Sequence, residues 1–472
     1  MLFPSEIFLF LFLPLTVLLY YGFFKRFKQG KYKNLFLFIA SVLFYAYGEP
    51  VYVFLMLFVI FMHYLFGLLV HKFKKQPFQQ KLVILIMILF DVLVFGYFKY
   101  ADFIINNINA LFHTKIDLVG VALPIGISFY TFQAISYVVD VYREQGTVQT
   151  NPLNVGLYIS LFPQLIAGPI VRYETIAKQI DHRKESFRQF SLGMNRFIIG
   201  LGKKVLLANQ FAIVADAVFE NVKAGSNSNS MFLLWLGAIS YTLQIFYDFA
   251  GYSDMAIGLG KMFGFRFEEN FNYPYIANSI SEFWRRWHIS LQTWFRDYVY
   301  IPLGGSRVDS KARLIFNIFI VWLLTGIWHG ANWTFIFWGL MYFVLILLER
   351  FTSIHEKLGK FQHLYTLFFV MLGWIFFRSD SLSIALTYVL GMIGIGAKGI
   401  FGGAFLQYLR QYLVYYCAGV ICCFPILKTM HKKLRKNIIY NTLYVICMLG
   451  IFALSVFFIF SNAYSPFIYF NF

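Results

Sequence analysis

The chain has 472 residues, of which 59% are hydrophobic, 21% are aromatic and only 13% are charged. A water-soluble domain carries about a quarter charged residues, so this composition excludes a soluble globule, and it also excludes a disordered, collagen-like or coiled-coil chain. Lys and Arg exceed Asp and Glu by 40 to 22, but they stand in short clusters beside apolar runs, which is typical of membrane proteins and does not indicate a nucleic acid partner. The sequence therefore predicts an all-α, polytopic protein embedded in the lipid bilayer.

Apolar runs long enough to cross a bilayer begin close to the N-terminus. Spans are predicted at about residues 7–24, 35–48, 51–70, 82–100 and 118–141. Basic clusters follow the first and the third span, and the positive-inside rule places both loops in the cytoplasm and the N-terminus outside. These clusters are Lys25, Arg26, Lys28, Lys31 and Lys33, and the stretch from His71 to Lys75.

The segment 161–169 interrupts this pattern. Its sequence, Leu161-Phe162-Pro163-Gln164-Leu165-Ile166-Ala167-Gly168-Pro169, is too short and too broken by Pro and Gly for a regular span. We expect a re-entrant or interfacial segment, which is tolerated at membrane depth only where protein or a water-filled cavity satisfies its backbone. The segment thus favours a funnel or pocket over a simple bundle, and the charged stretch 178–188 that follows is predicted to be cytoplasmic.

The second half of the chain continues the same alternation. Apolar runs fall near residues 190–219, 231–251, 312–329, 333–349, 364–377, 384–397, 412–427 and 440–460. The basic residues between 428 and 436 indicate a cytoplasmic loop, so we expect the C-terminus outside. With no internal repeat and no long linker, residues 1–472 are predicted to form one integral-membrane domain with about 10 to 12 crossings.

Polar residues in apolar surroundings are costly and mark candidate sites. The first such segment is 281–298, which contains Trp284, Trp287, Trp294 and His288. An amphipathic helix at the membrane surface, with its tryptophans at the level of the lipid headgroups and its arginines on phosphates, would fit most of this segment. It would not require His288, and Glu282 lies three and four residues before Arg285 and Arg286, a spacing that favours local ion pairing.

The second segment is 325–334, within the apolar stretch from Leu314 to Leu348. It holds His329, the most intramembrane histidine of the chain, for which a structural and a catalytic role fit the composition equally well. Gly326 and Gly330 flank it and leave room for close approach of backbone or ligand. Asn332 follows three residues later and could orient the imidazole or bind a carbonyl oxygen.

Other recognisable chemistry is sparse. Asp248 and Asp254 lie at or near membrane depth, but a spacing of six does not put both on one face of a helix. We interpret them first as structural partners of arginines, with a catalytic role as the second interpretation. Neither Gly202-Lys203 nor Gly260-Lys261 is followed by Ser or Thr, so there is no P-loop. No Cys or His spacing fits a zinc site, and no metal is predicted.

Taken together, the two polar segments resemble the signature of the membrane-bound O-acyltransferase (MBOAT) family, in its bacterial alginate O-acetyltransferase-like branch. The resemblance covers about residues 1–380, with a signature core at about 120–350. The C-terminal helices at about 364–460 match less closely. The residues that carry it are Asn272-Tyr273-Pro274-Tyr275, Glu282 to Leu291, Trp294 to Gly305, Gly326 to Trp333, Ser128 to Gln133 and Phe162 to Ile170.

This resemblance implies a ring of membrane helices, with re-entrant and interfacial helices around a central funnel. It implies an enzyme of the bacterial inner membrane that moves a short acyl group, expected to be acetyl, from a cytoplasmic thioester to an extracytoplasmic hydroxyl. The donor would be acetyl-coenzyme A or another acyl thioester, with no tightly bound cofactor. The acceptor would be a polysaccharide such as alginate or a cell-wall polymer, or a hydroxyl on an extracytoplasmic partner protein that is itself acetyltransferase-like.

The resemblance also assigns roles to residues. His329 corresponds to the catalytic histidine and His288 to a second position that is usually polar and often histidine in the family. Asn332 and Trp328 are candidate donors to the carbonyl oxygen that becomes negative in the transition state, and Arg285 and Arg286 are candidates for an anionic donor, although lipid phosphates would suit them equally.

Three other functions stay open on the sequence, one of which is a membrane scaffold that only recruits a secreted partner enzyme. A second branch of the family transfers D-alanine to teichoic acid from a carrier protein, although Ile301-Pro302-Leu303-Gly304-Gly305 favours the acetyl-transferring branch. A polytopic transporter or flippase would also use intramembrane polar residues and broken helices, but corresponding interrupted helices in two halves of the chain are not evident.

Overall fold

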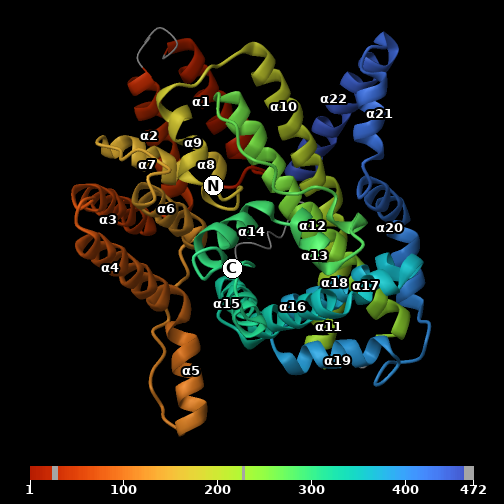
Figure 1. The fold of residues 1–472 in the computed structure, drawn as a ribbon. Coiled ribbons are helices and arrows are strands. Elements are labelled where there is room, and N and C mark those ends of the chain that lie inside the picture. Colours follow the sequence, from red (N-terminus) through yellow and green to blue (C-terminus); the bar gives the residue numbers. More distant parts are fainter. Residues whose placement is uncertain (24–29, 226–228, 462–472) are drawn as a thin grey trace. The chain divides into compact units, whose positions relative to one another are not determined.

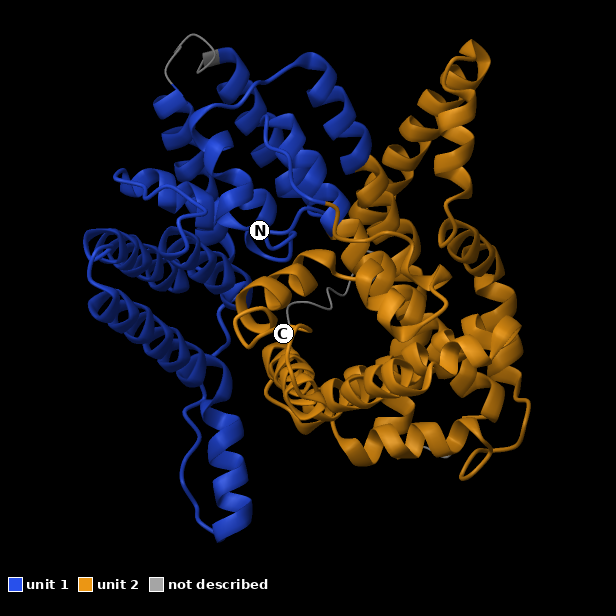
Figure 2. Ribbon diagram, in the orientation of Figure 1, with its two compact units in different colours: residues 1–197, 253–268, 472 blue, residues 198–252, 269–471 orange. Residues whose placement is uncertain are grey.

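The computed structural model describes residues 1–23, 30–225 and 229–461. Within these ranges every regular element is a helix, which confirms the predicted all-α class (Figure 1). Over the described residues, the helices form two compact units, one within residues 1–197 and 253–268 and the other within residues 198–252 and 269–461 (Figure 2). The boundary falls within two helices, α10 (Phe187–Gly202) and α12 (Met231–Met262). One domain over residues 1–472 and a ring around a funnel stay predictions.

The first unit is built from the N-terminal helices. They are η1 (Phe8–Phe12), α1 (Leu13–Leu18), η2 (Leu19–Phe23), α2 (Gly30–Gly48), α3 (Tyr52–Lys72), α4 (Pro77–Phe95), η4 (Gly96–Tyr100), α5 (Ala101–Phe112), α6 (Ile127–Tyr142), α7 (Pro152–Ser160), α8 (Phe162–Leu165), α9 (Tyr173–Asp181), most of α10 and the end of α12. Small residues let α10 and α12 approach closely here, because a Cβ on Gly193 would lie 2.5 Å from the backbone oxygen of Gly258.

The second unit holds both polar segments. Its helices are η5 (Lys203–Ala208), α11 (Asn209–Lys223), most of α12, η6 (Pro274–Ile276), α13 (Ile280–Arg286), α14 (Ile289–Phe295), η7 (Arg296–Tyr300), α15 (Lys311–His329), α16 (Trp333–Thr352), α17 (Ile354–Lys357), η8 (Gly359–Phe361), α18 (Gln362–Arg378), α19 (Leu382–Met392), α20 (Gly403–Cys422), α21 (Ile426–Leu434) and α22 (Ile438–Phe460). The hairpin of α15 and α16 and the short pair α13 and α14 position the candidate site.

Eight helical stretches among the described residues are long and apolar enough to cross a membrane. A ninth is possible if α20 and α21, which meet at a bend of 66°, count as one broken span. The apolar helices Phe8–Gly22 and Leu382–Met392 are shorter. Counted with the bent pair, they bring the total among the described residues to 11, within the predicted 10 to 12. The protein is thus a multi-pass membrane protein.

The predicted span at 118–141 differs from the structure at its start. Helix α6 begins only at Ile127, because Pro124 and Gly126 precede it and Gly126 has a left-handed backbone with φ of 75°. The prediction for segment 161–169 is confirmed in that no regular span forms there: only the four-residue α8 interrupts the buried chain. The basic residues Lys25, Arg26 and Lys28, and the chain end after residue 461, lie outside the described residues.

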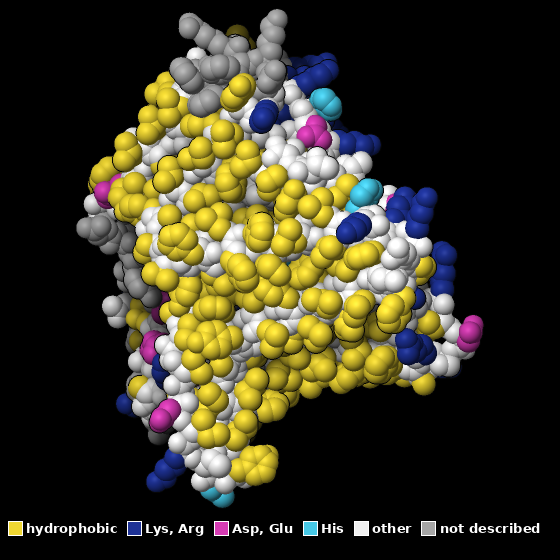
Figure 3. Space-filling view, turned by 90° about the vertical axis from the view of Figure 1, so that its left-hand side faces the viewer, with side chains coloured by type: hydrophobic (Ala, Val, Ile, Leu, Met, Phe, Trp, Pro, Cys, Tyr) yellow, Lys and Arg dark blue, Asp and Glu magenta, His cyan; other side chains and the backbone are white. Residues whose placement is uncertain are grey.

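The outer surface of α3 and α4 is strongly apolar. Figure 3 shows this side of the molecule as mostly hydrophobic, with Lys and Arg gathered near its margins. Large exposed side chains of the two helices include Phe54, Phe58, Phe61, Leu85, Leu89 and Leu93. A surface of this kind would drive aggregation in water. In a bilayer the lipid tails contact it, and its apolar side chains are not exposed to water.

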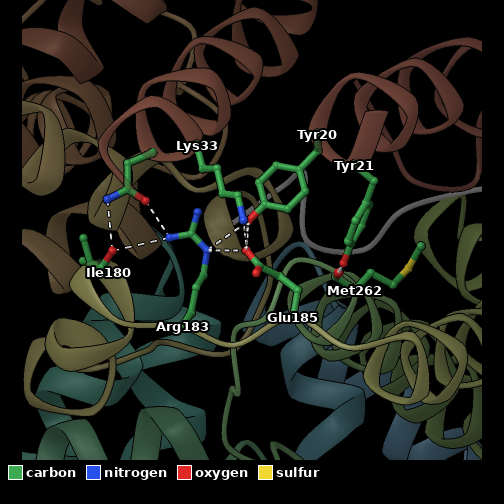
Figure 4. A network of polar contacts seen from close by, with 8 residues as sticks. Tyr20, Tyr21, Lys33, Ile180, Arg183, Glu185 and Met262 are labelled. Carbon is green, nitrogen blue, oxygen red and sulfur yellow. Dashed lines mark hydrogen bonds and ion pairs between the residues drawn. The ribbon is translucent and has the colours of Figure 1, made fainter. Parts of the chain in front are cut away.

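A polar clamp fastens the chain between α9 and α10 to the N-terminal helices (Figure 4). The guanidinium of Arg183 donates to the Tyr20 hydroxyl at 3.1 Å and to Asn34 Oδ1 at 2.5 Å, while Glu185 Oε1 accepts from Tyr20 at 2.7 Å and from Lys33 at 3.0 Å. Burial alone would raise the pKa of Glu185, but the hydrogen bonds from Tyr20 and Lys33 and the charges of Lys33 and Arg183 hold it below its ordinary value.

Candidate functional site

The hairpin of α15 and α16 fixes the position of His329, the last residue of α15. Two glycines allow the helices to touch backbone to backbone: a Cβ on Gly326 would lie 2.6 Å from the oxygen of Phe335, and one on Gly339 would lie 2.5 Å from the oxygen of Trp322. The expected role of Gly326 in close backbone approach is therefore confirmed. The hairpin holds His329 on a rigid support rather than on a loop.

Aromatic rings surround the His329 imidazole. The ring centroids of Trp328 and Trp338 lie 4.9 Å from it, that of Phe377 lies 5.1 Å away, and all three rings meet it edge to face. His329 is only 4% exposed. Packing of this kind fixes the orientation of the imidazole and keeps bulk water away from it.

The pair α13 and α14 is tied to α16 by a buried carboxylate. Glu349 of α16 accepts hydrogen bonds from the backbone N–H groups of Ile280 at 2.6 Å and Ser281 at 3.0 Å, and from the Ser281 hydroxyl at 2.8 Å. Ser279 caps the same helix by accepting from the N–H of Glu282 at 3.0 Å. These hydrogen bonds fix the N-terminus of α13 relative to α16. Because α16 and α15 form one hairpin, they also fix it relative to His329 at the end of α15.

His288 occupies a strained turn between α13 and α14. Its backbone is left-handed, with φ of 46° and ψ of 53°, which is unfavourable for a residue with a Cβ. Its Nδ1 lies 3.1 Å from Asn270 Oδ1, and the Phe249 ring meets the imidazole edge to face at 4.6 Å between centroids. Burial lowers the pKa of His288 to about 3, so the imidazole is neutral at physiological pH.

Both histidines contact one indole. The centroid of the Trp328 ring lies 4.9 Å from that of His329 and 6.2 Å from that of His288. The structure therefore brings together three of the six residues singled out in the sequence, although 40 residues separate the two histidines in the chain.

The two arginines have different surroundings. Arg286 forms an ion pair with Glu282 at 2.7 Å and donates to the backbone oxygen of Asn272 at 3.1 Å, which confirms the local pairing expected from the spacing. Arg285 is exposed. Of the two, Arg285 is the better placed to receive an anionic group from solvent.

Asn332 acts at the start of α16. Its Oδ1 accepts from the N–H of Thr334 at 3.0 Å, and its Nδ2 donates to the backbone oxygen of Asp380 at 2.8 Å. The side chain is therefore a helix cap that also holds the chain after α18. Its suggested role in binding a carbonyl oxygen stays a prediction.

The interpretation of segment 281–298 as one amphipathic helix with its tryptophans facing lipid is wrong, because the segment forms the two short helices α13 and α14 on either side of a turn at His288. Trp284, Trp287 and Trp294 are 5%, 2% and 5% exposed, and the first two pack in an aromatic cluster of the second unit. Its other members include Tyr275, Phe283, Trp322, Trp338, Tyr342 and Trp374. The tryptophans pack inside the protein and not at lipid headgroups.

The two intramembrane aspartates are structural, as predicted, but only one pairs with an arginine. Asp254 accepts from Arg196 at 2.6 and 2.9 Å. Asp248 instead pairs with Lys204 at 2.6 Å, with both side chains almost fully buried. Over the described ranges, no group of three or more His, Cys, Asp or Glu side chains is arranged to hold a metal ion.

Two residues of this region were missed by the sequence reasoning. Asn270 lies two positions before the quoted motif at 272–275, and Glu349 lies at the end of an apolar run. A buried carboxylate in a long apolar helix is a signal that could have found Glu349. Asn270 carries no signal without the fold, because its partner is 18 positions away.

The chain is similar in sequence to known proteins of one family. The model of the MBOAT, membrane-bound O-acyltransferase family, matches residues 147–385. A probable alginate O-acetylase of Pseudomonas syringae is 43% identical over 82% of this chain and 74% of its own length, and a peptidoglycan O-acetyltransferase of Helicobacter pylori is 32% identical over 100% and 98%. A teichoic acid D-alanyltransferase of Bacillus subtilis is 32% identical, but over only 50% of this chain and 60% of its own.

Proposed function

This chain belongs to the membrane-bound O-acyltransferase family and is a membrane O-acyltransferase, and from that premise we propose that it transfers an acetyl group to a hydroxyl of an extracytoplasmic polysaccharide. The donor is a cytoplasmic thioester, acetyl-coenzyme A in the first instance, and the enzyme works in the bacterial inner membrane. The observation that carries the proposed site is the buried His329, held by a glycine-packed hairpin beside a second buried histidine.

The relatives favour transfer of an acetyl group over transfer of D-alanine. The alginate and peptidoglycan O-acetylating relatives match 82% and 100% of this chain, whereas the D-alanyltransferase matches half of it. The motif from Ile301 to Gly305 points to the same branch. The transporter interpretation finds no support, since the relatives named above are all described as acyl-transferring proteins.

The reaction needs one base at His329. As the hydroxyl oxygen of the acceptor attacks the thioester carbonyl, the imidazole takes the hydroxyl proton; the new C–O bond forms, the C–S bond breaks, and the imidazolium returns the proton to the leaving thiolate. No nucleophilic Ser or Cys is required. The aromatic rings around His329 hold the imidazole in one orientation and limit access of water, which would otherwise hydrolyse the thioester.

The remaining groups have supporting roles. Trp328 touches both imidazoles, and its indole N–H is our candidate donor to the developing oxyanion. Because Asn332 caps α16, we place it second for that role. Arg285, which is exposed, is our first candidate for the phosphates of the donor. Arg286, which forms an ion pair with Glu282, is the second. An extracytoplasmic, acetyltransferase-like protein is proposed as a partner.

The test is the O-acetyl content of surface polysaccharide in cells that express the wild type, His329→Ala or His288→Ala at matched membrane levels. His71→Ala, at the exposed end of α3, serves as the control for loss of a histidine. We expect acetylation to fall to background in His329→Ala and to be unchanged in His71→Ala. Normal acetylation in a folded His329→Ala protein would refute the assignment, and the polymer that loses acetyl groups identifies the acceptor.

A further inference from the structure

Asn270 is the polar residue that defines the chemical state of His288. Three hydrogen-bonding groups converge on its Oδ1: the N–H of Ser290 at 3.2 Å, the hydroxyl of Ser290 at 2.8 Å and Nδ1 of His288 at 3.1 Å. Asn270 and His288 are each 1% exposed. Of these three residues, Asn270 lies outside every motif that carries the family resemblance, whereas His288 and Ser290 lie within the stretch Glu282 to Leu291.

The tautomer of His288 follows from these contacts. A backbone N–H can only donate, so the side-chain atom of Asn270 that faces Ser290 must be the amide oxygen and not the nitrogen. An amide oxygen can only accept, so Nδ1 of His288 must carry a proton. A neutral imidazole has a single N–H, and its Nε2 then carries a lone pair.

The position of the ring is fixed by three further features. The backbone oxygen of Asn270 accepts from the N–H of Ile289 at 2.9 Å, which fastens the strained turn at His288. Phe249 of α12 meets the imidazole at an interplanar angle of 90°. A left-handed residue other than glycine persists only where its surroundings over-determine it, and such residues gather at functional sites.

We propose that Asn270 is a positioning residue for the transfer reaction, which holds His288 as the Nδ1–H tautomer so that Nε2 accepts a hydrogen bond from an O–H or N–H group of a substrate. This inference rests on the proposed function and assigns the role of its second histidine. An imidazole in this state cannot donate to an oxyanion, so His288 binds and orients a substrate while His329 moves the proton. The group bound is a neighbouring hydroxyl of the acceptor or an amide N–H of the thioester donor.

Two variants separate positioning from simple structural support. In Asn270→Ala the imidazole loses its acceptor, and we expect transfer to fall about tenfold, the effect of one hydrogen bond. In Asn270→Asp a carboxylate oxygen still accepts from Nδ1 and from Ser290, so activity above neutral pH should recover to within about threefold of wild type. The carboxylate also stabilises the imidazolium, and a protonated Nε2 can no longer accept.

The pH profile is the decisive readout. Phe249 of α12, Trp328 of α15 and Ser290 of α14, which contact the imidazole, are uncharged, and burial lowers the pKa of His288. The wild type should therefore show no loss of activity from His288 between about pH 5 and 8, whereas Asn270→Asp should lose activity as the pH falls through a raised His288 pKa. Identical profiles for the two proteins, or equal activity of the Ala and Asp variants, would overturn the proposal.

Michaelis constants identify the substrate that His288 binds. A raised KM for the polysaccharide in Asn270→Ala supports binding of the acceptor, and a raised KM for the acyl thioester supports binding of the donor. A fall in kcat with both constants unchanged contradicts a positioning role in substrate binding.

Nitrogen NMR of the intact protein in lipid, labelled with ¹⁵N-histidine, tests the tautomer without any assay of transfer. The His288 signals are those lost in His288→Gln. We expect a protonated Nδ1 and an unprotonated Nε2 in the wild type and in Asn270→Asp above neutral pH. A protonated Nε2 in the wild type would refute the inference even if transfer depends on His329, and an inactive wild type with the expected tautomer would refute only the proposed function.

Discussion

Substitution of Gly326 by alanine tests whether the packing of the hairpin controls the reaction. The added Cβ would lie 2.6 Å from the backbone oxygen of Phe335 and 3.3 Å from the Cα of Ile336. Ordinary contact begins near 3.4 Å, so α15 and α16 must separate by about 0.8 Å, because a backbone oxygen in a helix cannot turn aside. His329 lies one helical turn further on and moves with its helix.

Two effects follow from this displacement. Overpacking of a tight interface costs about 1–3 kcal/mol of stability, and a misplacement approaching 1 Å lowers catalysis by up to about a hundredfold. We therefore expect Gly326→Ala to reach the membrane, to unfold at a lower temperature in detergent, and to transfer acetyl groups about ten- to a hundredfold more slowly.

Gly450→Ala is the matched control, because among the described residues no atom outside the glycine's own stretch of α22 lies within 4 Å of a Cβ built on it. It should leave both stability and transfer at wild-type levels. Wild-type transfer by Gly326→Ala, measured as labelled acetyl incorporated per folded protein, would show that the contact between α15 and α16 does not position His329.

Three further predictions concern the scaffold. Glu349→Gln should lower the unfolding temperature by an amount equivalent to about 1–3 kcal/mol, since an amide nitrogen cannot accept from the N–H groups that start α13. Unchanged thermal unfolding would contradict a stabilising role for the hydrogen bonds of Glu349. Asp248→Ala should destabilise the protein by about 3–5 kcal/mol because it leaves the buried Lys204 without its ion-pair partner. The double variant Lys204→Met with Asp248→Leu should restore most of the lost stability in the same thermal unfolding assay. The pKa of Glu185 in the folded state lies below its ordinary value of 4.5, so the ionised carboxylate stabilises the fold above pH 4.5, and this stability is lost as the pH falls through the folded-state pKa. Between about pH 6 and 3, the unfolding temperature should therefore fall more steeply in the wild type than in Glu185→Gln. Parallel curves for the two proteins would refute this reasoning.

The long apolar helices were predictable because hydrophobic length alone defines them. The predicted spans at 312–329 and 333–349 match α15 (Lys311–His329) and α16 (Trp333–Thr352) closely. The start of helix α6 was not predictable in this way, because Pro124 and Gly126 stop the helix although the apolar pattern continues before them. A hydrophobic run reports burial or lipid contact but does not report backbone conformation.

The candidate site was only partly predictable for a related reason. His329 stands out because an imidazole is rare within an apolar run. The tryptophans of segment 281–298 were misplaced because the amphipathic pattern of an interfacial helix and that of a helix in an aromatic core are alike. The contacts of His288 with Asn270 and Phe249 bridge 18 and 39 positions of the chain, and only the left-handed turn at His288 brings them together.

The measurement that tests the central claim most directly is acetyl transfer by purified protein in proteoliposomes, with labelled acetyl-coenzyme A on one side and polysaccharide on the other. The account predicts transfer by the wild type, a fall of about 10²–10⁴-fold in His329→Ala, and a wild-type rate in His71→Ala. A correctly folded His329→Ala protein that transfers acetyl groups at the wild-type rate would contradict the account.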